Sequence, residues 1–123
     1  MQQTAFPQVN SGMQDQELVV VMTTVATLTD ANALAEKMIR DRLAACVQIE
    51  GEIVSHYRWD GKQERSTEHR LSMKTTRQKL GAIRSAFQDA HPYELPQWVV
   101  LTAADQQHPY VDWVRESVVE EQG

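Results

Sequence analysis

The stretch that decides the fold is residues 53–76, which read IVSHYRWDGKQERSTEHRLSMKTT. Its side chains alternate between two faces on both sides of Asp60-Gly61, and this dipeptide is the strongest short-range signal for a tight hairpin turn. The sequence therefore predicts a long β-hairpin. Its first strand carries on one face Ile53, Ser55, Tyr57 and Trp59. Its second strand carries on one face Glu68, Arg70, Ser72 and Lys74.

Two strands and a helix are expected before the hairpin. The β-branched run at residues 18–24 is typical of a strand that is buried on both faces and therefore central in its sheet. Thr29 or Asp30 is expected to cap the helix that follows, which is amphipathic. Residues 44–49 then return to a strand, and Gly51 marks a bulge or bend in it.

A second helix is expected to begin at Thr76 and to end at His91, because the residue before a proline avoids the helical region. Residues 97–102 form the next strand. A short final helix begins near Pro109 and carries on one side Tyr110, Trp113 and Val114. The order is β-α-β-β-α-β followed by a helix, so we predict an α+β fold of the ferredoxin-like class.

The chain of 123 residues has the composition of one globular domain, which we place at residues 17–119, after a flexible polar tail at residues 1–16. The net charge of −5 and the lack of a basic run argue against a nucleic-acid or membrane partner. Residues 1–16 also lack the apolar core of a secretory signal. The single Cys46 cannot form an intramolecular disulfide, which fits a reducing cytoplasm.

Helices cover one face of such a sheet, and the other face needs covering too. This chain has no spare element for that task, apart from the final helix and the end of the hairpin. Packing between subunits is the simplest solution.

Residues 18–113 resemble the CutA family of divalent-cation-tolerance proteins. The matching pieces keep the order and spacing of the family, and they are Leu43-Ala44-Ala45-Cys46-Val47, Tyr57-x-Trp59-x-Gly61-Lys62, Glu68, Met73-Lys74-Thr75-Thr76, His91-Pro92-Tyr93-Glu94-x-Pro96 and Tyr110-x-x-Trp113. The resemblance implies a compact PII-like homotrimer with clefts between its subunits. It also implies a role in tolerance of divalent metal ions, with copper as a possible bound ion.

Copper binding in members of this family involves a cysteine on the first strand and a pair of histidines before the Pro-Tyr sequence. This chain has Thr23 at the strand position and Ala90-His91 at the pair, so His91 is the metal candidate that the resemblance leaves.

Six further residues are expected to line a cleft between subunits, where a divalent cation or a small anionic ligand would bind: Trp59, Glu68, Lys74, Tyr93, Glu94 and Trp113. Packing in a subunit interface is the favoured role of the aromatic side chains, and the same side chains can also form the wall of a ligand pocket. Lys74 can present a cation to an anion at a helix start. The two glutamates offer carboxylate oxygens near His91. Glu68 can instead form an ion pair with Lys74 or Arg70, or, because Lys74 is six positions away on the same strand, with a cation on another strand.

No nucleophile with an adjacent base stands out, so the sequence predicts a binding protein and not an enzyme. One alternative is a small acylphosphatase-like hydrolase, which would need a phosphate cradle after the first strand; residues 23–28 contain no Arg, Lys or Gly. The other alternative is a structural trimer that anchors another protein.

Overall fold

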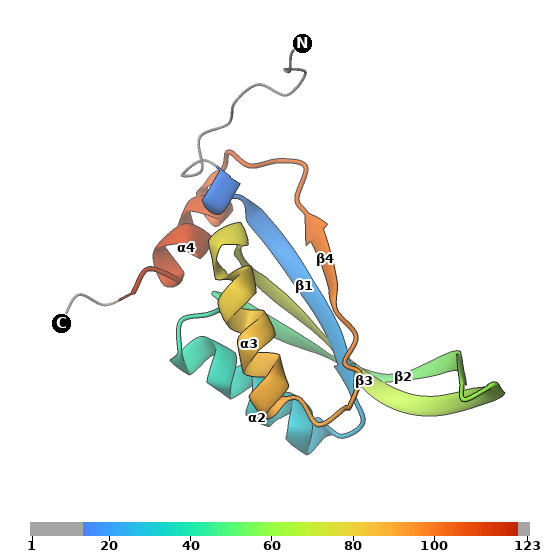
Figure 1. Cartoon of the computed structure of the whole chain (residues 1–123). Helices are drawn as coiled ribbons and strands as arrows, with labels where there is room; N and C mark the ends of the chain where they lie inside the picture. The colour runs from blue at the N-terminus through green and yellow to red at the C-terminus, as the bar shows by residue number, and fades with distance from the viewer. Residues whose placement is uncertain (1–13, 121–123) are drawn as a thin grey trace, which may run out of the picture.

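The computed structural model describes residues 14–120, so most of the predicted tail, residues 1–13, lies outside the described part of the chain. The elements along the chain are β1 (Leu18–Val25), α2 (Leu28–Arg40), β2 (Cys46–Trp59), β3 (Lys62–Thr76), α3 (Leu80–Ala90), β4 (Val99–Thr102) and α4 (Pro109–Ser117) (Figure 1). The predicted α+β class and the order of strands and helices are confirmed.

The four strands form an antiparallel sheet in the order β2-β3-β1-β4, so β1 is central as predicted. Val21 on β1 lies opposite Met73 on β3, and both pack into the core beneath α2 and α3. The prediction that β1 is buried on both faces is wrong for Val20 and Met22, which are only partly buried. They point to the face that these two helices leave uncovered.

Two helix starts differ from the prediction. Helix α2 is capped by Thr27, whose side-chain oxygen accepts from the backbone N–H of Asp30 at 3.1 Å. The first N–H groups of the helix need an acceptor, and the Thr27 hydroxyl supplies it. The cap therefore lies two residues before Thr29, the first of the two predicted caps. After β3, the 3-10 turn Arg77–Lys79 precedes α3, so Thr76 begins that turn and not the α-helix.

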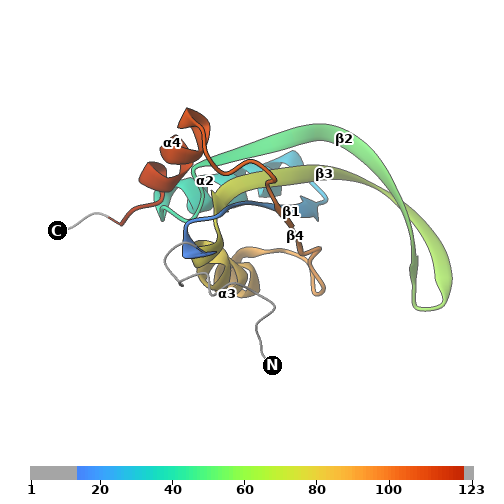
Figure 2. The same ribbon diagram turned by 90° about the horizontal axis from the view of Figure 1, so that it is seen from above.

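The long hairpin β2–β3 is confirmed, and its end projects well beyond the rest of the chain (Figure 2). Asp60 and Gly61 have φ values of 50° and 72° at the turn. Positive φ at both central residues is what a tight turn between twisted strands requires. The expected irregularity at Gly51 is present as a register shift between Glu50 and Ile53.

Helix α4 packs Val111 and Val114 against Leu18 at one end of the sheet. The prediction that Tyr110, Trp113 and Val114 share one side is corrected, because Tyr110 and Trp113 are 43% and 45% exposed. The valines form the buried stripe of the helix, and the two aromatics border that stripe with nearly half of their surface exposed.

Candidate functional site

His91, the predicted metal residue, is held by two hydrogen bonds within its own chain. It ends α3 directly before Pro92 and is only 8% exposed. Its Nε2 lies 3.0 Å from Oγ1 of Thr23, and its Nδ1 accepts from the backbone N–H of Tyr93 at 3.1 Å. Because Nδ1 accepts, the proton of the neutral ring is on Nε2 and is donated to Thr23. Burial lowers the pKa of His91, which keeps the ring neutral.

Glu68 and Tyr93 form the second contact of this region. The hydroxyl of Tyr93 donates to Oε2 of Glu68 at 2.8 Å, and Glu68 is 7% exposed. Burial alone would raise the pKa of Glu68, but hydrogen bonds with Ser55, Tyr93 and Thr24 outweigh it and hold the pKa below its ordinary value. Burial and the neighbouring carboxylate raise the pKa of Tyr93. The pair is therefore a carboxylate that accepts from a neutral phenol.

Glu68 makes neither of the ion pairs that the sequence suggested. Arg70 donates instead to Glu50, with its Nε 2.9 Å from Oε1, and Lys74 bonds to Oε1 of Gln48. Both partners lie on the neighbouring strand β2: Glu50 is directly opposite Arg70, and Gln48 is diagonal to Lys74, within reach of its long side chain. Within residues 14–120, Glu68 has no cationic partner, and its charge is balanced by hydrogen bonds alone.

A groove of about 400 Å³ opens beside these contacts, between α3 and the segment leading to β4. It is lined by Arg84, Phe87, Gln88, Tyr93, Glu94, Pro96 and Trp98. Trp98 meets Phe87 edge to face at a centroid distance of 5.5 Å. Trp98 lies outside β4, which begins at Val99 and not at residue 97 as predicted. Four of the predicted residues thus come together. Tyr93 and Glu94 line the groove, and Glu68 and His91 contact Tyr93.

The other three predicted residues lie apart from this groove in the single chain. Trp59 ends β2 beside the hairpin turn and is 46% exposed. Trp113 is exposed on α4, next to Tyr110 at a ring-centroid distance of 5.5 Å. Lys74 lies near the other end of β3, opposite Val20 and Cys46 in the sheet. One chain therefore does not bring all of the expected cleft residues into one site.

Residues 19–117 match the family described as CutA1 divalent ion tolerance protein. The chain belongs to this CutA1 family. The fold agrees, because solved CutA structures superpose on it over more than four-fifths of its length.

Three relatives show how close the CutA1 resemblance is. The divalent-cation tolerance protein CutA of Thermus thermophilus is 36% identical over 98 residues, which cover 80% of this chain and 95% of that protein. CutA from Synechococcus elongatus PCC7942, solved in complex with a Bis-Tris molecule, is 42% identical with a TM-score of 0.75, over 82% of this chain and 93% of that one. The periplasmic divalent cation tolerance protein CutA from Archaeoglobus fulgidus is 28% identical with a TM-score of 0.79, over 83% and 99%.

The donor set in this CutA1 chain does not fit a metal site within a single chain. Among residues 14–120, no three His, Cys, Asp or Glu side chains lie together to hold an ion. Both ring nitrogens of His91 are engaged, and its neighbour Thr23 offers a neutral hydroxyl where a thiolate would bind copper far better. A strong copper site would need further ligands.

Sequence reasoning missed Arg84, Trp98, Ser55 and Thr24. Arg84 places its guanidinium carbon 4.9 Å from the centre of the Trp98 ring. The one available signal was the tryptophan two residues after Pro96, in a segment already rich in aromatic residues. Ser55 and Thr24 become recognisable only when the strands are paired, because each lies far from Glu68 in the sequence.

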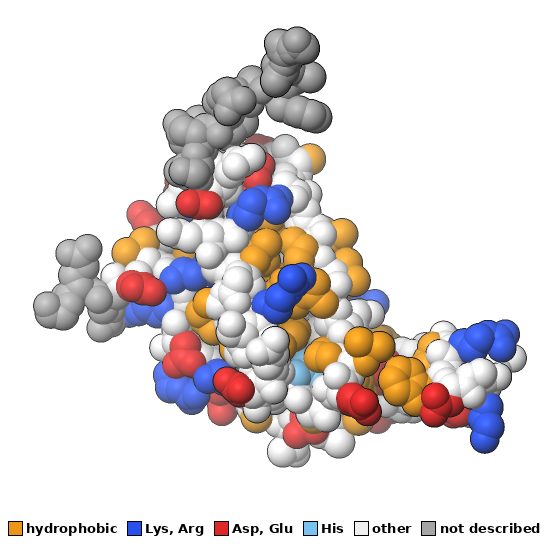
Figure 3. All heavy atoms as spheres, in the orientation of Figure 1, with side chains coloured by type: hydrophobic (Ala, Val, Ile, Leu, Met, Phe, Trp, Pro, Cys, Tyr) orange, Lys and Arg blue, Asp and Glu red, His pale blue; other side chains and the backbone are white. Residues whose placement is uncertain are grey.

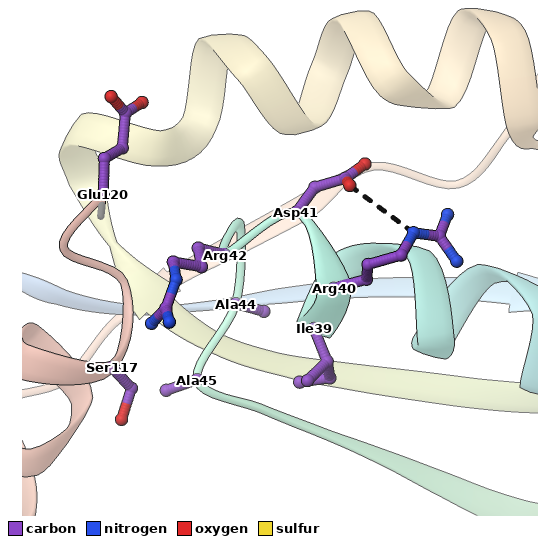
Figure 4. A pocket seen from close by; sticks show the side chains of 8 residues that line it. All are labelled: Ile39, Arg40, Asp41, Arg42, Ala44, Ala45, Ser117 and Glu120. Atoms are coloured by element: carbon purple, nitrogen blue, oxygen red, sulfur yellow. Dashed lines mark ion pairs between the residues drawn. The ribbon is translucent and has the colours of Figure 1, made fainter. Parts of the chain in front are cut away.

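A second pocket, of about 650 Å³, lies between the end of α2 and the end of α4 (Figure 4). Its lining mixes charges of both signs, and Arg40 pairs there with Asp41 at 3.6 Å. None of the residues that the sequence singled out for binding lines it.

Proposed function

We propose that this CutA1 chain works as a homotrimeric binding protein in divalent-cation tolerance. Each cleft between subunits would hold a divalent cation weakly, or a small ligand, without chemical turnover. The observation that most supports the proposal is a sheet face that α2 and α3 leave uncovered, bordered by exposed aromatic side chains.

The assembly part of the proposal rests on exposed apolar surface. Large side chains between 41% and 51% exposed lie on the hairpin, β4 and α4, and they are Tyr57, Trp59, Val99, Leu101, Tyr110 and Trp113. Patches of this kind usually mark interaction sites, and obligate interfaces bury roughly 2,000 Å² or more. The strands β2 and β4 are also the two edges of the sheet, so each offers a backbone edge to a neighbouring subunit.

The cation part of the proposal rests on Glu68. It is a buried carboxylate that lacks a cationic partner within residues 14–120. A buried charge is stabilised when an opposite charge is brought against it. A neighbouring subunit that closes the cleft could supply ligands so that Glu68, the exposed Glu94 and His91 share a divalent ion. Binding is expected to be weak, because His91 must first release Thr23.

Calorimetric titration of the assembled protein with Cu²⁺ and Zn²⁺ tests the cation part. We expect saturable binding in the sub-millimolar range that weakens in Glu68→Gln and His91→Ala. The control is His56→Ala, which removes an exposed hairpin histidine and should bind as the parent does. Absence of saturable binding by either metal would remove the cation from the proposal.

The small-ligand part is supported by the Synechococcus elongatus CutA, which was solved in complex with a Bis-Tris molecule. A family member therefore holds a small polar molecule. The lining of the groove beside α3, with aromatic walls and a few polar groups, is typical of small-molecule sites, which span roughly 300–1,000 Å³.

The hydrolase alternative gains no support from the loop after β1. That loop consists of Ala26 and Thr27, and the Thr27 side chain is used to cap α2. A cradle for a transferring phosphoryl group needs cationic side chains or several free N–H groups, and these two residues supply no cation.

None of the helices within residues 14–120 is long and apolar enough to cross a membrane. We propose a cytoplasmic location on the separate ground that the chain has a single cysteine, which fits a reducing compartment. The Archaeoglobus fulgidus relative is described as periplasmic, so cell fractionation of the host is the deciding experiment.

A further inference from the structure

The groove beside α3 has walls that are fixed before any ligand arrives. The ring of His91 packs against Phe87 and Tyr93 at centroid distances of 5.2 Å in both cases. The hydroxyl of Tyr93 is held by Glu68, and the far side of the His91 ring is held by Thr23. Because the side chains of the groove are already held in place, ligand binding costs little of their conformational entropy, and this favours binding of small molecules.

The groove carries one charge of each sign. The Arg84 guanidinium lies over Trp98 on the α3 side, and the exposed Glu94 carboxylate lies on the loop side. Within the part of the chain that the structure describes, neither forms an ion pair, with the other or with a third residue. Figure 3 shows hydrophobic side chains along the boundary between α3 and the sheet edge, with a basic side chain across them. The stacked guanidinium still has N–H groups to donate to an anion.

We propose that this groove binds a small zwitterion with an apolar body, the class of free hydrophobic amino acids. The ligand carboxylate would accept from Arg84, its ammonium would donate to Glu94, and its apolar part would cover Tyr93 and Pro96. An ammonium next to a carboxylate matches the two charges of the groove, whereas a simple anion satisfies Arg84 and leaves Glu94 opposed. This inference names the ligand class for the small-ligand part of the proposed function and rests on that part.

Three probes of nearly equal shape separate the two charges: L-phenylalanine, L-phenylalaninamide, which lacks the carboxylate, and 3-phenylpropionate, which lacks the ammonium. Each is titrated into the assembled protein by calorimetry at neutral pH. Since a hydrogen bond to a charged group is worth enough to change affinity by about tenfold, L-phenylalanine should bind about 5- to 10-fold more tightly than either of the others.

Two variants assign the charges to residues. Glu94→Gln should weaken the binding of L-phenylalanine and L-phenylalaninamide by about 5- to 10-fold, and it should tighten the binding of 3-phenylpropionate, whose carboxylate no longer meets a like charge. Arg84→Gln should weaken L-phenylalanine and 3-phenylpropionate and leave L-phenylalaninamide unchanged. The matched controls are Glu36→Gln and Arg40→Gln, two exposed positions on α2 outside the groove.

The proposal is overturned if L-phenylalanine does not bind up to its solubility limit, if the three probes bind equally, or if neither groove variant changes their ranking. Its failure is distinguishable from failure of the wider proposal, because metal titration and the mass of the assembly are measured on the same samples. If a trimer binds metal but does not bind L-phenylalanine, only the inference of a zwitterionic ligand fails, and the wider proposal stands.

Discussion

Nε2 of His91 lies 3.0 Å from Oγ1 of Thr23, so the last residue before the Pro92 turn is hydrogen-bonded to β1, one of the two inner strands of the sheet. Two of the three positions that the CutA resemblance links to copper, 23 and 91, are therefore neighbours in this chain. What differs is the chemistry at position 23. In this chain a neutral hydroxyl accepts a hydrogen bond from the imidazole, whereas a cysteine thiolate at this position could share a metal ion with the imidazole.

Thr23→Cys should turn this contact into a copper-binding pair. A thiolate is a soft ligand that favours Cu(I), so we expect Cu(I) affinity at least about tenfold above that of the parent. Competition against a chromogenic chelator measures it. Thr23→Ser keeps the hydroxyl and should show no gain, and equal affinities for all three proteins would contradict the expectation.

Stability should fall at mildly acidic pH because of His91. Burial places its folded-state pKa below the ordinary value of 6.5. The unfolded chain then takes up a proton before the folded chain does, so unfolding becomes easier as pH falls from about 6.5 toward the folded pKa, and the contribution is constant above 6.5. Thermal melts across this window should show a falling melting temperature for the parent.

His91→Gln removes the titrating ring and should flatten that part of the pH profile. His56→Gln changes an exposed histidine at the hairpin and should keep the parent slope. If the dependence of melting temperature on pH persists in His91→Gln and disappears in His56→Gln, the effect comes from His56, and the account is refuted.

Glu68 and Tyr93 should prove energetically coupled. Tyr93→Phe removes one donor to the buried carboxylate and is expected to cost about 1 kcal/mol, whereas Glu68→Ala leaves the Tyr93 hydroxyl without its acceptor and is expected to cost about 1–3 kcal/mol. The double variant should cost less than the sum, by about 1 kcal/mol. Denaturant unfolding of the four proteins gives the cycle, and strict additivity would exclude the contact as a source of stability.

Much of the fold could be predicted because it follows local rules. Asp60-Gly61 fixes the hairpin turn through backbone preference alone. The predicted cap of α2 is wrong because Thr27, Thr29 and Asp30 are all good capping residues, and residue preference alone does not choose among them; in the structure Thr27 has the extended backbone of a cap. In α4, four nearly adjacent apolar residues leave the buried side undecided until the helix meets Leu18.

The candidate site was harder to predict because its contacts join distant segments. Strand alternation placed Glu68 on a face, but what covers it there is Tyr93, 25 positions away along the chain. Arg70 and Lys74 found acceptors on β2, which the sequence alone did not pair in register. The role of Arg84 depends on Trp98 lying against α3, and no periodicity within either segment signals that contact.

Trp59→Ala should loosen the assembly. Aromatic anchors at interface centres often carry much of the binding energy, so we expect a melting temperature lower by roughly 5 °C or more and a greater tendency to dissociate on dilution. The matched control is Val54→Ala, which removes an exposed apolar side chain from the opposite face of the same strand. If both variants melt and sediment like the parent, the hairpin face bearing Trp59 is not part of the interface.

Sedimentation equilibrium of the parent chain at low micromolar concentration tests the central claim most directly. We predict a single species with three times the chain mass of 14.0 kDa, because three copies would cover the sheet faces and aromatic rings that one copy leaves exposed. A folded species of 14.0 kDa that persists under these conditions would contradict the account.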